Sequence, residues 1–181
     1  DNTVPDFTAR YANRGAWGFV SVAGLLRQLR NDTGLRSTTD TGFGVSVSSK
    51  IMFGENDLRL MATAGSGIGR YVGLNFFEDG VLEANGDIDS LDVVAAYAAW
   101  RQVWGGGWRS NFVLGYTSAD NDRALTGLNA NAEASSARVN LFWTPAPKLD
   151  LGIELSTAKR ELERGTSGTQ NRIDFMARYS F

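Results

Sequence analysis

The sequence predicts an all-β fold, a transmembrane antiparallel β-barrel with up-and-down strands. First, apolar and polar residues alternate along much of the chain, which is the period of a strand with two different faces. Second, the connections between these segments are alternately short and long, as in outer-membrane barrels. Third, no stretch of about 18 consecutive apolar residues exists, which excludes an α-helical membrane span.

The composition excludes most catalytic sites. The chain has 181 residues and contains neither His nor Cys, so it has no Ser–His–Asp triad, no Cys–His pair, no zinc site built on these ligands and no disulfide. The 18 Lys and Arg nearly balance the 20 Asp and Glu, which argues against a nucleic-acid-binding domain. We expect a single barrel segment over residues 1–181 that is no enzyme and needs no cofactor or metal.

The first five expected strands follow the alternation to different degrees. Residues 4–13 and 17–29 come first, and the second of these segments is apolar on both faces for part of its length. Residues 43–53 alternate strictly, with apolar residues at most odd positions and Gly, Ser or Lys at most even positions. Residues 58–64 and 91–103 follow, the latter again partly apolar on both faces.

The last four expected strands alternate along their length. They are residues 108–116, 137–143, 149–155 and 172–181. Aromatic and aliphatic residues hold most of one parity, whereas Arg, Asn, Asp, Glu or Gly are frequent on the other. The sequence therefore predicts nine strands.

The connections predict which rim of the barrel each strand end belongs to. The short ones carry Gly, Asn or Pro and lie at 14–15, 54–57, 105–107 and 145–148. The long ones carry most of the acidic residues and lie at 31–41, 65–90, 118–134 and 161–170. We expect the short turns on the periplasmic side and the long loops outside the cell.

A soluble sandwich or a lipocalin-like barrel would show the same period of two, with its apolar face inside. Two observations favour the membrane barrel. The whole chain has three Lys, although Lys is the residue that usually solubilises an exposed strand face. Aromatic residues lie at segment ends, as the interfacial belts of a membrane barrel require. They are Tyr11, Trp17, Phe43, Phe53, Trp104, Trp108, Tyr116, Trp143 and Phe181.

The end of the chain supports this fold. Tyr179 and Phe181 resemble the C-terminal signature by which outer-membrane proteins are recognised for assembly, so they are the expected assembly signal. If Phe181 is periplasmic, strand alternation places Asp1 outside the cell. Single-chain bacterial barrels have an even number of strands, so nine strands suggest the C-terminal half of a larger barrel of about 16 strands.

Several strings of residues resemble the DcaP-like porins, a family of trimeric outer-membrane channels. Two resemble consecutive mid-barrel strands, one a Gly-rich loop, one the start of a strand, and two the penultimate and closing strands. They are residues 5–11, 22–30, 65–71, 109–111, 145–154 and 172–181. Together they cover essentially the whole chain and align with the second half of the family's barrel.

The resemblance implies a porin in the outer membrane of a Gram-negative bacterium, a passive diffusion channel for small anions such as dicarboxylates and aromatic acids. It also implies a homotrimer that contacts outer-membrane lipid, lipopolysaccharide and the barrel assembly machinery, with no nucleic-acid partner.

The parity of the expected strands independently predicts a cationic lumen. Basic residues outnumber acidic ones on the parity opposite the apolar face, and rings of Arg and Lys favour anions in a pore. The expected inward bases are Arg10, Arg27, Lys50, Arg59, Arg101, Arg109, Arg138, Arg160, Arg172 and Arg178, and the expected inward acids are Asp6, Asp150, Glu154 and Asp174.

The same cations could instead pair with acids and stiffen the wall. We expect such pairing for Arg172 and Arg178 with Asp174, and for Arg160 with Glu154. The residues with no inward acid within two positions on their own strand are the expected anion ligands, namely Arg59, Arg101, Arg109 and Arg138.

The connection at 65–90 is long enough to fold into the lumen as a constriction loop carrying Arg70, or to leave Arg70 on the surface. Two other functions stay open. One is a plugged structural or adhesive barrel without conductance, in which the charges pair fully. The other is an outer-membrane enzyme, which the absence of His makes a poor fit.

Overall fold

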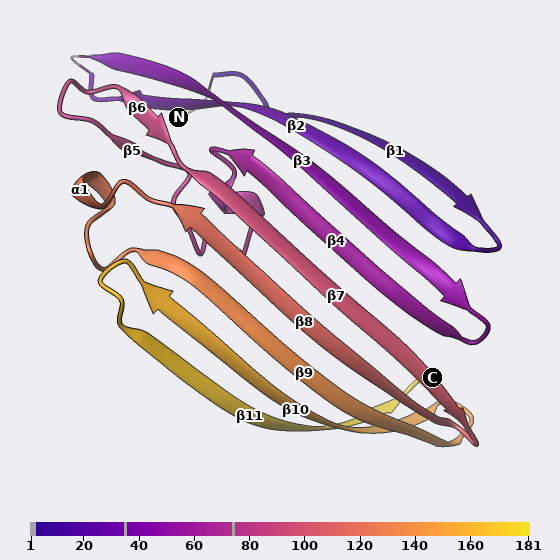
Figure 1. Ribbon diagram of the computed structural model, residues 1–181. Helices are drawn as coiled ribbons and strands as arrows, with labels where there is room; N and C mark the ends of the chain where they lie inside the picture. Colours follow the sequence, from indigo (N-terminus) through magenta and orange to yellow (C-terminus); the bar gives the residue numbers. More distant parts are fainter. Residues whose placement is uncertain (1–2, 35, 74) are drawn as a thin grey trace.

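The structure is a computed structural model that describes residues 3–34, 36–73 and 75–181, so the expectation for Asp1 falls outside the described residues. Nine antiparallel strands form one sheet in which successive strands of the sheet are neighbours (Figure 1). This confirms the predicted up-and-down order of nine strands. The strands are β1 Phe7–Gly15, β2 Gly18–Asp32, β3 Ser37–Phe53, β4 Asn56–Ser66, β7 Asp92–Gly105, β8 Trp108–Asp120, β9 Asn131–Ala146, β10 Leu149–Leu162 and β11 Ser167–Tyr179.

The remaining elements are small. The strands β5 Gly80–Leu82 and β6 Ile88–Ser90 form a separate hairpin between β4 and β7. The helical elements of the described chain are the 3-10 turn η1 Gly69–Tyr71 and the single turn α1 Arg123–Thr126. Neither is long and apolar enough to cross a membrane.

Most strands continue beyond their predicted ends at the long-loop rim. For example, β3 begins at Ser37 instead of residue 43, and β10 ends at Leu162 instead of residue 155. Two connections predicted to be long are therefore short, at 33–36 and 163–166, whereas the connections at 121–130 and 67–91 remain long. The period of two does not reveal the added parts because polar residues occupy both of their faces, as in Ser37–Thr41.

The opposite rim has tight turns that depend on glycine. Gly54 has φ +63° and follows β3, and Gly107 has φ +82° and precedes β8. A Cβ on Gly107 would lie 2.7 Å from the carbonyl oxygen of Thr144 on β9, so a larger residue would separate the two strands.

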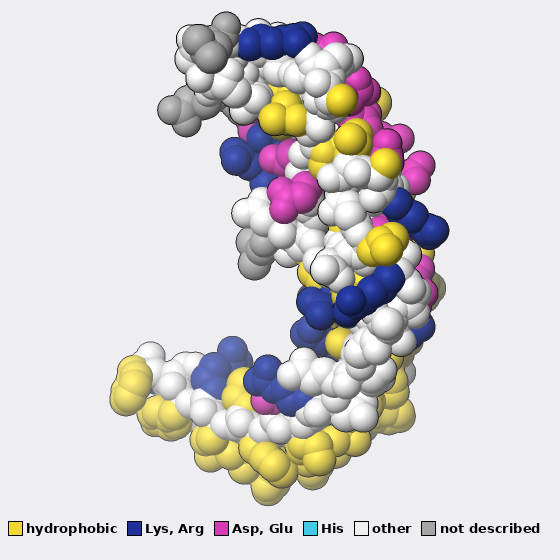
Figure 2. Space-filling model, turned by 90° about the vertical axis from the view of Figure 1, so that its left-hand side faces the viewer, with side chains coloured by type: hydrophobic (Ala, Val, Ile, Leu, Met, Phe, Trp, Pro, Cys, Tyr) yellow, Lys and Arg dark blue, Asp and Glu magenta, His cyan; other side chains and the backbone are white. Residues whose placement is uncertain are grey.

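The sheet is curved into an arc (Figure 2). Among the described residues no hydrogen-bonded pairing joins β1 to β11, so the arc is open. In the lower half of Figure 2 hydrophobic side chains cover the convex side, and Lys and Arg lie on the concave side. Leu114, Ile173 and Phe175 are 62%, 61% and 80% exposed. A convex face of exposed apolar side chains suits lipid and not water, which decides against the soluble barrel.

Candidate functional site: the concave face of the sheet

The concave face is formed by every second residue of each strand, the set that alternates with the exposed apolar residues of the convex face. We call these two sets the concave and the convex parity. All ten basic residues expected to point inward lie on the concave parity. Four of them share one register row across seven strands, from β3 to β11. That row reads Lys50, Arg59, Ala99, Val113, Arg138, Ser156 and Arg172.

One buried carboxylate gathers three of these cations. The side chain of Asp57 on β4 is fully buried, and Arg59 Nε lies 2.7 Å from its Oδ1. Lys50 Nζ and Arg101 Nη1 each lie 3.6 Å from Asp57 Oδ2. The three cationic side chains remain between 28% and 46% exposed. This Asp57 cluster therefore presents three positive charges against one negative charge.

The Asp57 cluster corrects the expectation that Arg59 and Arg101 have no acid nearby. The sequence places Asp57 in a turn at 54–57, but Phe53 pairs with Asn56, so the turn has only two residues. Asp57 thus belongs to β4 and shares the parity of Arg59, two residues later. Extending the alternation of β4 backward by one step would have found it.

A second carboxylate corrects the expectation for Arg109. Asp150 on β10 lies 3.1 Å from Arg109 Nη2, and Arg178 Nη2 donates to its other oxygen. Thr144 Oγ1 donates to Asp150 over 2.6 Å and accepts from Arg109 Nη1 over 2.8 Å. Arg178 was expected to pair with Asp174, but the register sets it directly opposite Asp150.

Of the two other ion pairs that the sequence predicts, one forms and one does not. The predicted pair of Arg172 with Asp174 is confirmed, since Arg172 Nη2 lies 2.6 Å from Asp174 Oδ1. Among the described residues, Arg160 makes no ion pair, so its expected pairing with Glu154 is wrong.

Of the four expected anion ligands, Arg138 alone has neither an ion pair nor a hydrogen bond within the described chain. Its side chain is exposed on β9. Arg10, another predicted lumen residue, donates from Nε to Ser21 Oγ over 2.7 Å and has no carboxylate partner among the described residues. Free positive charge on the concave face is therefore carried by few side chains besides the Asp57 cluster.

Arg27 is not an open wall residue, because a loop covers it. Its side chain is 1% exposed, and Nη1 lies 2.8 Å from Asp79 Oδ2 and 2.9 Å from the carbonyl oxygen of Gly67. Nε is buried without a hydrogen-bond partner, 3.7 Å from Asp6 Oδ2. The guanidinium carbon lies 5.6 Å from the centre of the Tyr71 ring. Arg27 therefore anchors the loop to β2.

The loop at 67–91 packs against the concave face. Its Ile68, Val72 and Phe77 form a buried apolar cluster with Val93 of β7. Tyr71 donates its hydroxyl proton to Asp6, which raises the pKa of that phenol, and Asp6 accepts the bond beside β1. The loop therefore contacts the wall from β1 to β7.

Two glycines of β3 lie beneath the loop, at positions where a side chain would collide with it. A Cβ on Gly42 of β3 would lie 2.9 Å from Arg27 Cγ and 3.1 Å from the carbonyl oxygen of Gly67. A Cβ on Gly44 would lie 3.2 Å from Ile68 Cγ2. We call Gly42 and Gly44 the glycine seat, because larger residues there would push the loop away.

Arg70 lies in η1, within this loop. Its side chain is 53% exposed, and Nε lies 3.6 Å from Asp79 Oδ2, while its backbone N–H donates to Asp79 Oδ1 over 2.8 Å. The structure therefore brings Arg70 to the concave side of the sheet, on a loop held by the wall.

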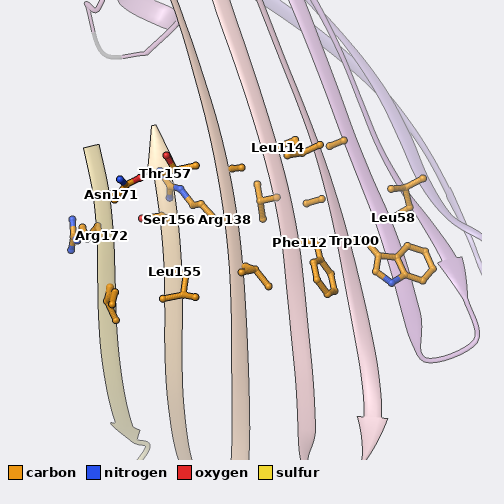
Figure 3. Close-up of a pocket in the computed structure, with 16 residues that line it drawn as sticks. Leu58, Trp100, Phe112, Leu114, Arg138, Leu155, Ser156, Thr157, Asn171 and Arg172 are labelled. Carbon is orange, nitrogen blue, oxygen red and sulfur yellow. The ribbon is translucent and has the colours of Figure 1, made fainter. Parts of the chain in front are cut away.

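A large hollow lies on the other face. It has a volume of about 900 Å³ and follows apolar side chains of the convex parity from β4 to β11 (Figure 3). Leu58, Trp100, Phe112 and Leu155 are among these side chains. Because this face suits lipid, we do not place the functional site there.

The expected assembly signal lies at the end of β11. Tyr179 is the last strand residue, and the rings of Tyr179 and Phe181 meet edge to face with their centres 5.5 Å apart. Both side chains are exposed, as residues recognised by another protein must be.

Comparisons with known proteins agree with this architecture. The family model described as DcaP outer membrane protein matches residues 1–181. No curated protein matches the chain in sequence. Among solved structures, the chain is similar to the outer membrane channel DcaP of Acinetobacter baumannii, with a TM-score of 0.91 and 24% identity. That match covers 100% of this chain and 53% of the other, so the chain spans about half the length of that channel.

Proposed function

Since the chain belongs to the DcaP outer membrane protein family, we propose that it forms part of the wall of a passive diffusion channel for small anionic solutes. The family sets its location in the outer membrane of a Gram-negative bacterium. The solved structure that it resembles is that of a channel, which supports conduction. Dicarboxylates and aromatic acids are the proposed solutes.

The observation that carries the anion preference is the excess of basic residues on the concave face. The Asp57 cluster holds two more positive than negative charges, and its cations are partly exposed. Guanidinium groups bind carboxylates through two parallel hydrogen bonds, so an anion that leaves bulk water finds matching donors. We propose Lys50, Arg59, Arg101 and Arg138 as the principal anion-facing residues, with Arg109 and Arg178 beside them. Arg10 adds a further positive charge on β1, whereas the buried Arg27 holds the loop.

The loop at 67–91 is the proposed constriction. It covers the concave side of the wall and carries Arg70 with half of its side chain exposed. A loop that occupies part of the lumen narrows the path for solutes, and a cation on it acts on every anion that passes.

Single-channel recording of the full-length protein in a planar bilayer tests this proposal. We expect an open channel whose reversal potential in a KCl gradient shows anion preference. Replacing Arg59 and Arg101 together by Gln should reduce that preference, whereas Lys159→Gln on the convex parity of β10 should leave it unchanged. Cation preference of the unmodified protein would reject the anion channel.

A plugged barrel is the second candidate, and the ion pairs favour it. Most of the concave cations have a carboxylate within 4.0 Å, including Arg27, Arg59, Arg101, Arg109, Arg172 and Arg178. If these pairs extended across the lumen, no current would flow. The same recording distinguishes the two functions, because a plugged barrel gives no conductance.

A homotrimer is also proposed, as are contacts with outer-membrane lipid, lipopolysaccharide and the barrel assembly machinery. The resemblance to trimeric porins supports the trimer, and the exposed apolar convex face supports the lipid contact. Native mass spectrometry of the detergent-extracted full-length protein should give three times the mass of its full-length chain, and a monomer would contradict the trimer.

A further inference from the structure

A small hollow on the concave face carries both signs of charge. It has a volume of about 190 Å³ and lies over β9, β10 and β11, below the long-loop rim. Its charged lining consists of two Arg and two acidic side chains, and Ser156 and Gln170 add a hydroxyl and an amide. The charged residues are Arg138, Arg172, Glu154 and Asp174.

Only half of this charge is internally paired. Arg172 donates from Nε and Nη2 to Asp174 Oδ1, over 2.8 and 2.6 Å. Within the described chain, neither Arg138 nor Glu154 has an ion-pair partner. Glu154 Oε2 accepts a hydrogen bond from Asn140 Nδ2 over 3.0 Å, and Oε1 has no hydrogen-bond partner among the residues that the structure describes.

The two unpaired groups are diagonal neighbours on adjacent strands. Arg138 is opposite Ser156, and Asn140 is opposite Glu154. Figure 3 shows the Arg138 side chain leaning from β9 across β10 near Ser156, while Arg172 points away from it beside β11. The hollow therefore offers a guanidinium and a carboxylate oxygen, each with unused hydrogen-bonding capacity.

We propose that this hollow binds zwitterionic solutes of the amino-acid class. The solute carboxylate accepts hydrogen bonds from the Arg138 guanidinium, and its ammonium group donates to Glu154. Ser156 and Gln170 supply further polar contacts. Since a water molecule occupies about 30 Å³ of liquid, the hollow has room for about six or seven non-hydrogen atoms. The proposal rests on the proposed channel, which brings solutes to the concave face.

Two simpler roles fit the hollow less well. A site for anions alone would not present two carboxylates, because like charges repel the ligand. A purely structural charge pair would close as Arg172 and Asp174 do, but no nitrogen of Arg138 lies within 4.0 Å of a Glu154 oxygen.

The test compares 4-aminobutyrate with butyrate, which has the same carboxylate and carbon chain but no ammonium group. Both are added to the full-length protein in planar bilayers, and their dissociation constants are obtained from current noise and blockage. The unmodified channel should bind 4-aminobutyrate about tenfold more tightly than butyrate, the effect of one charge-assisted hydrogen bond in a wet site.

Two variants and one control separate the roles of the two charges. Glu154→Gln keeps an oxygen for Asn140 and should weaken 4-aminobutyrate binding about tenfold without weakening butyrate binding. Arg138→Gln should weaken the binding of both solutes. Lys159→Gln, on the convex parity of the same strand, should change neither dissociation constant.

The outcomes distinguish this site from the channel itself. Two results overturn the site and leave the channel. In the first, the current is anion-selective but 4-aminobutyrate and butyrate have equal dissociation constants. In the second, Glu154→Gln leaves both dissociation constants unchanged. Absence of any current overturns the channel. In that case equilibrium dialysis with labelled 4-aminobutyrate still decides the site, and equal uptake by the protein and by Glu154→Gln rejects it.

Discussion

Asp57 is the residue whose surroundings most strongly shape the concave face. A buried carboxylate is stable only with compensating charge and hydrogen bonds, and three cations meet that need here. Asp57 in turn holds these three cations side by side, although their like charges repel one another. The acid therefore keeps positive charge concentrated on the wall.

Replacing Asp57 by Asn should lower stability and raise anion preference together. Without the carboxylate, Lys50, Arg59 and Arg101 repel one another, and we expect a loss of about 1–2 kcal/mol, reduced by the partial exposure of the cations. Urea unfolding in lipid vesicles measures the stability, and the reversal potential measures the preference. Asp174→Asn, which removes a more exposed pair with Arg172, is the control and should destabilise less. Equal stability of the two variants would contradict the role of Asp57.

Which residues face the concave side could be predicted from the sequence, but their partners could not. Parity follows from the period of two, so every predicted inward Arg lies on the expected face. Partners depend on register, which turns and bulges set. Asp150 illustrates this, because it lies at a register shift between Leu149 and Leu151 and meets Arg109 from two strands away. No spacing within one strand predicts such a contact.

At the scale of elements, strand number was predictable and strand length was not. Lipid imposes the apolar alternation only on the part of each strand that it touches. The ends of β3 and β10 at the long-loop rim lie beyond that part. The inward fold of the loop at 67–91 was one of two open predictions for Arg70. Its contacts with Asp6 and Arg27 connect distant parts of the sequence and leave no local pattern.

Substitution in the glycine seat should release this loop without unfolding the barrel. Gly42→Val places a side chain against Arg27 and the backbone of Gly67, so we expect faster protease cleavage within 67–91. Gly24→Val is the matched control, because nothing lies within 4 Å of a Cβ at Gly24 on β2. Cleavage at the same rate in both variants would show that the seat does not hold the loop.

The turn at α1 should respond to acid. Glu163 accepts two hydrogen bonds, one from Asn121 Nδ2 and one from Arg123 Nε, each over 2.7 Å. These bonds lower the pKa of Glu163 below its usual 4.5. A carboxyl group with a lowered pKa in the folded state stabilises that state above its unfolded pKa, and the stabilisation is lost as pH falls through the folded pKa. Amide hydrogen exchange over 121–130, relative to its intrinsic rate, should therefore accelerate as the pH falls below the usual carboxyl pKa of 4.5 and through the lowered pKa of Glu163.

The variant Glu163→Gln provides the control for this pH dependence. It cannot ionise, so its exchange in the same segment should be faster at neutral pH and insensitive to further acidification after correction for the intrinsic rate. A native protein whose corrected exchange is constant from pH 6 to pH 3 would exclude Glu163 as the cause.

At the scale of the whole molecule, the convex face should tolerate charge only near its rims. Leu114 lies between the rim aromatics Trp108 and Tyr116 on β8 and is 62% exposed. Leu114→Arg should destabilise the folded protein in lipid vesicles by about 2–4 kcal/mol, the cost of Arg near the bilayer midplane. Ser135→Arg on the same face of β9, directly opposite the rim residue Tyr116, should cost less than Leu114→Arg. Equal effects would contradict a lipid-facing band.

The glycine seat limits which residues of the loop can change without loss of its contacts with the wall. The seat lies in β3, and the loop residues that hold to the wall around it include Tyr71, Phe77 and Asp79. Arg70 lies among these anchoring residues, but its side chain is half exposed and, within the described chain, makes one ion pair, with Asp79 of the same loop. A different residue at position 70 would therefore change the charge that the loop presents to the interior, while Arg27, Asp6 and the glycine seat still hold the loop and every membrane-spanning strand stays unchanged.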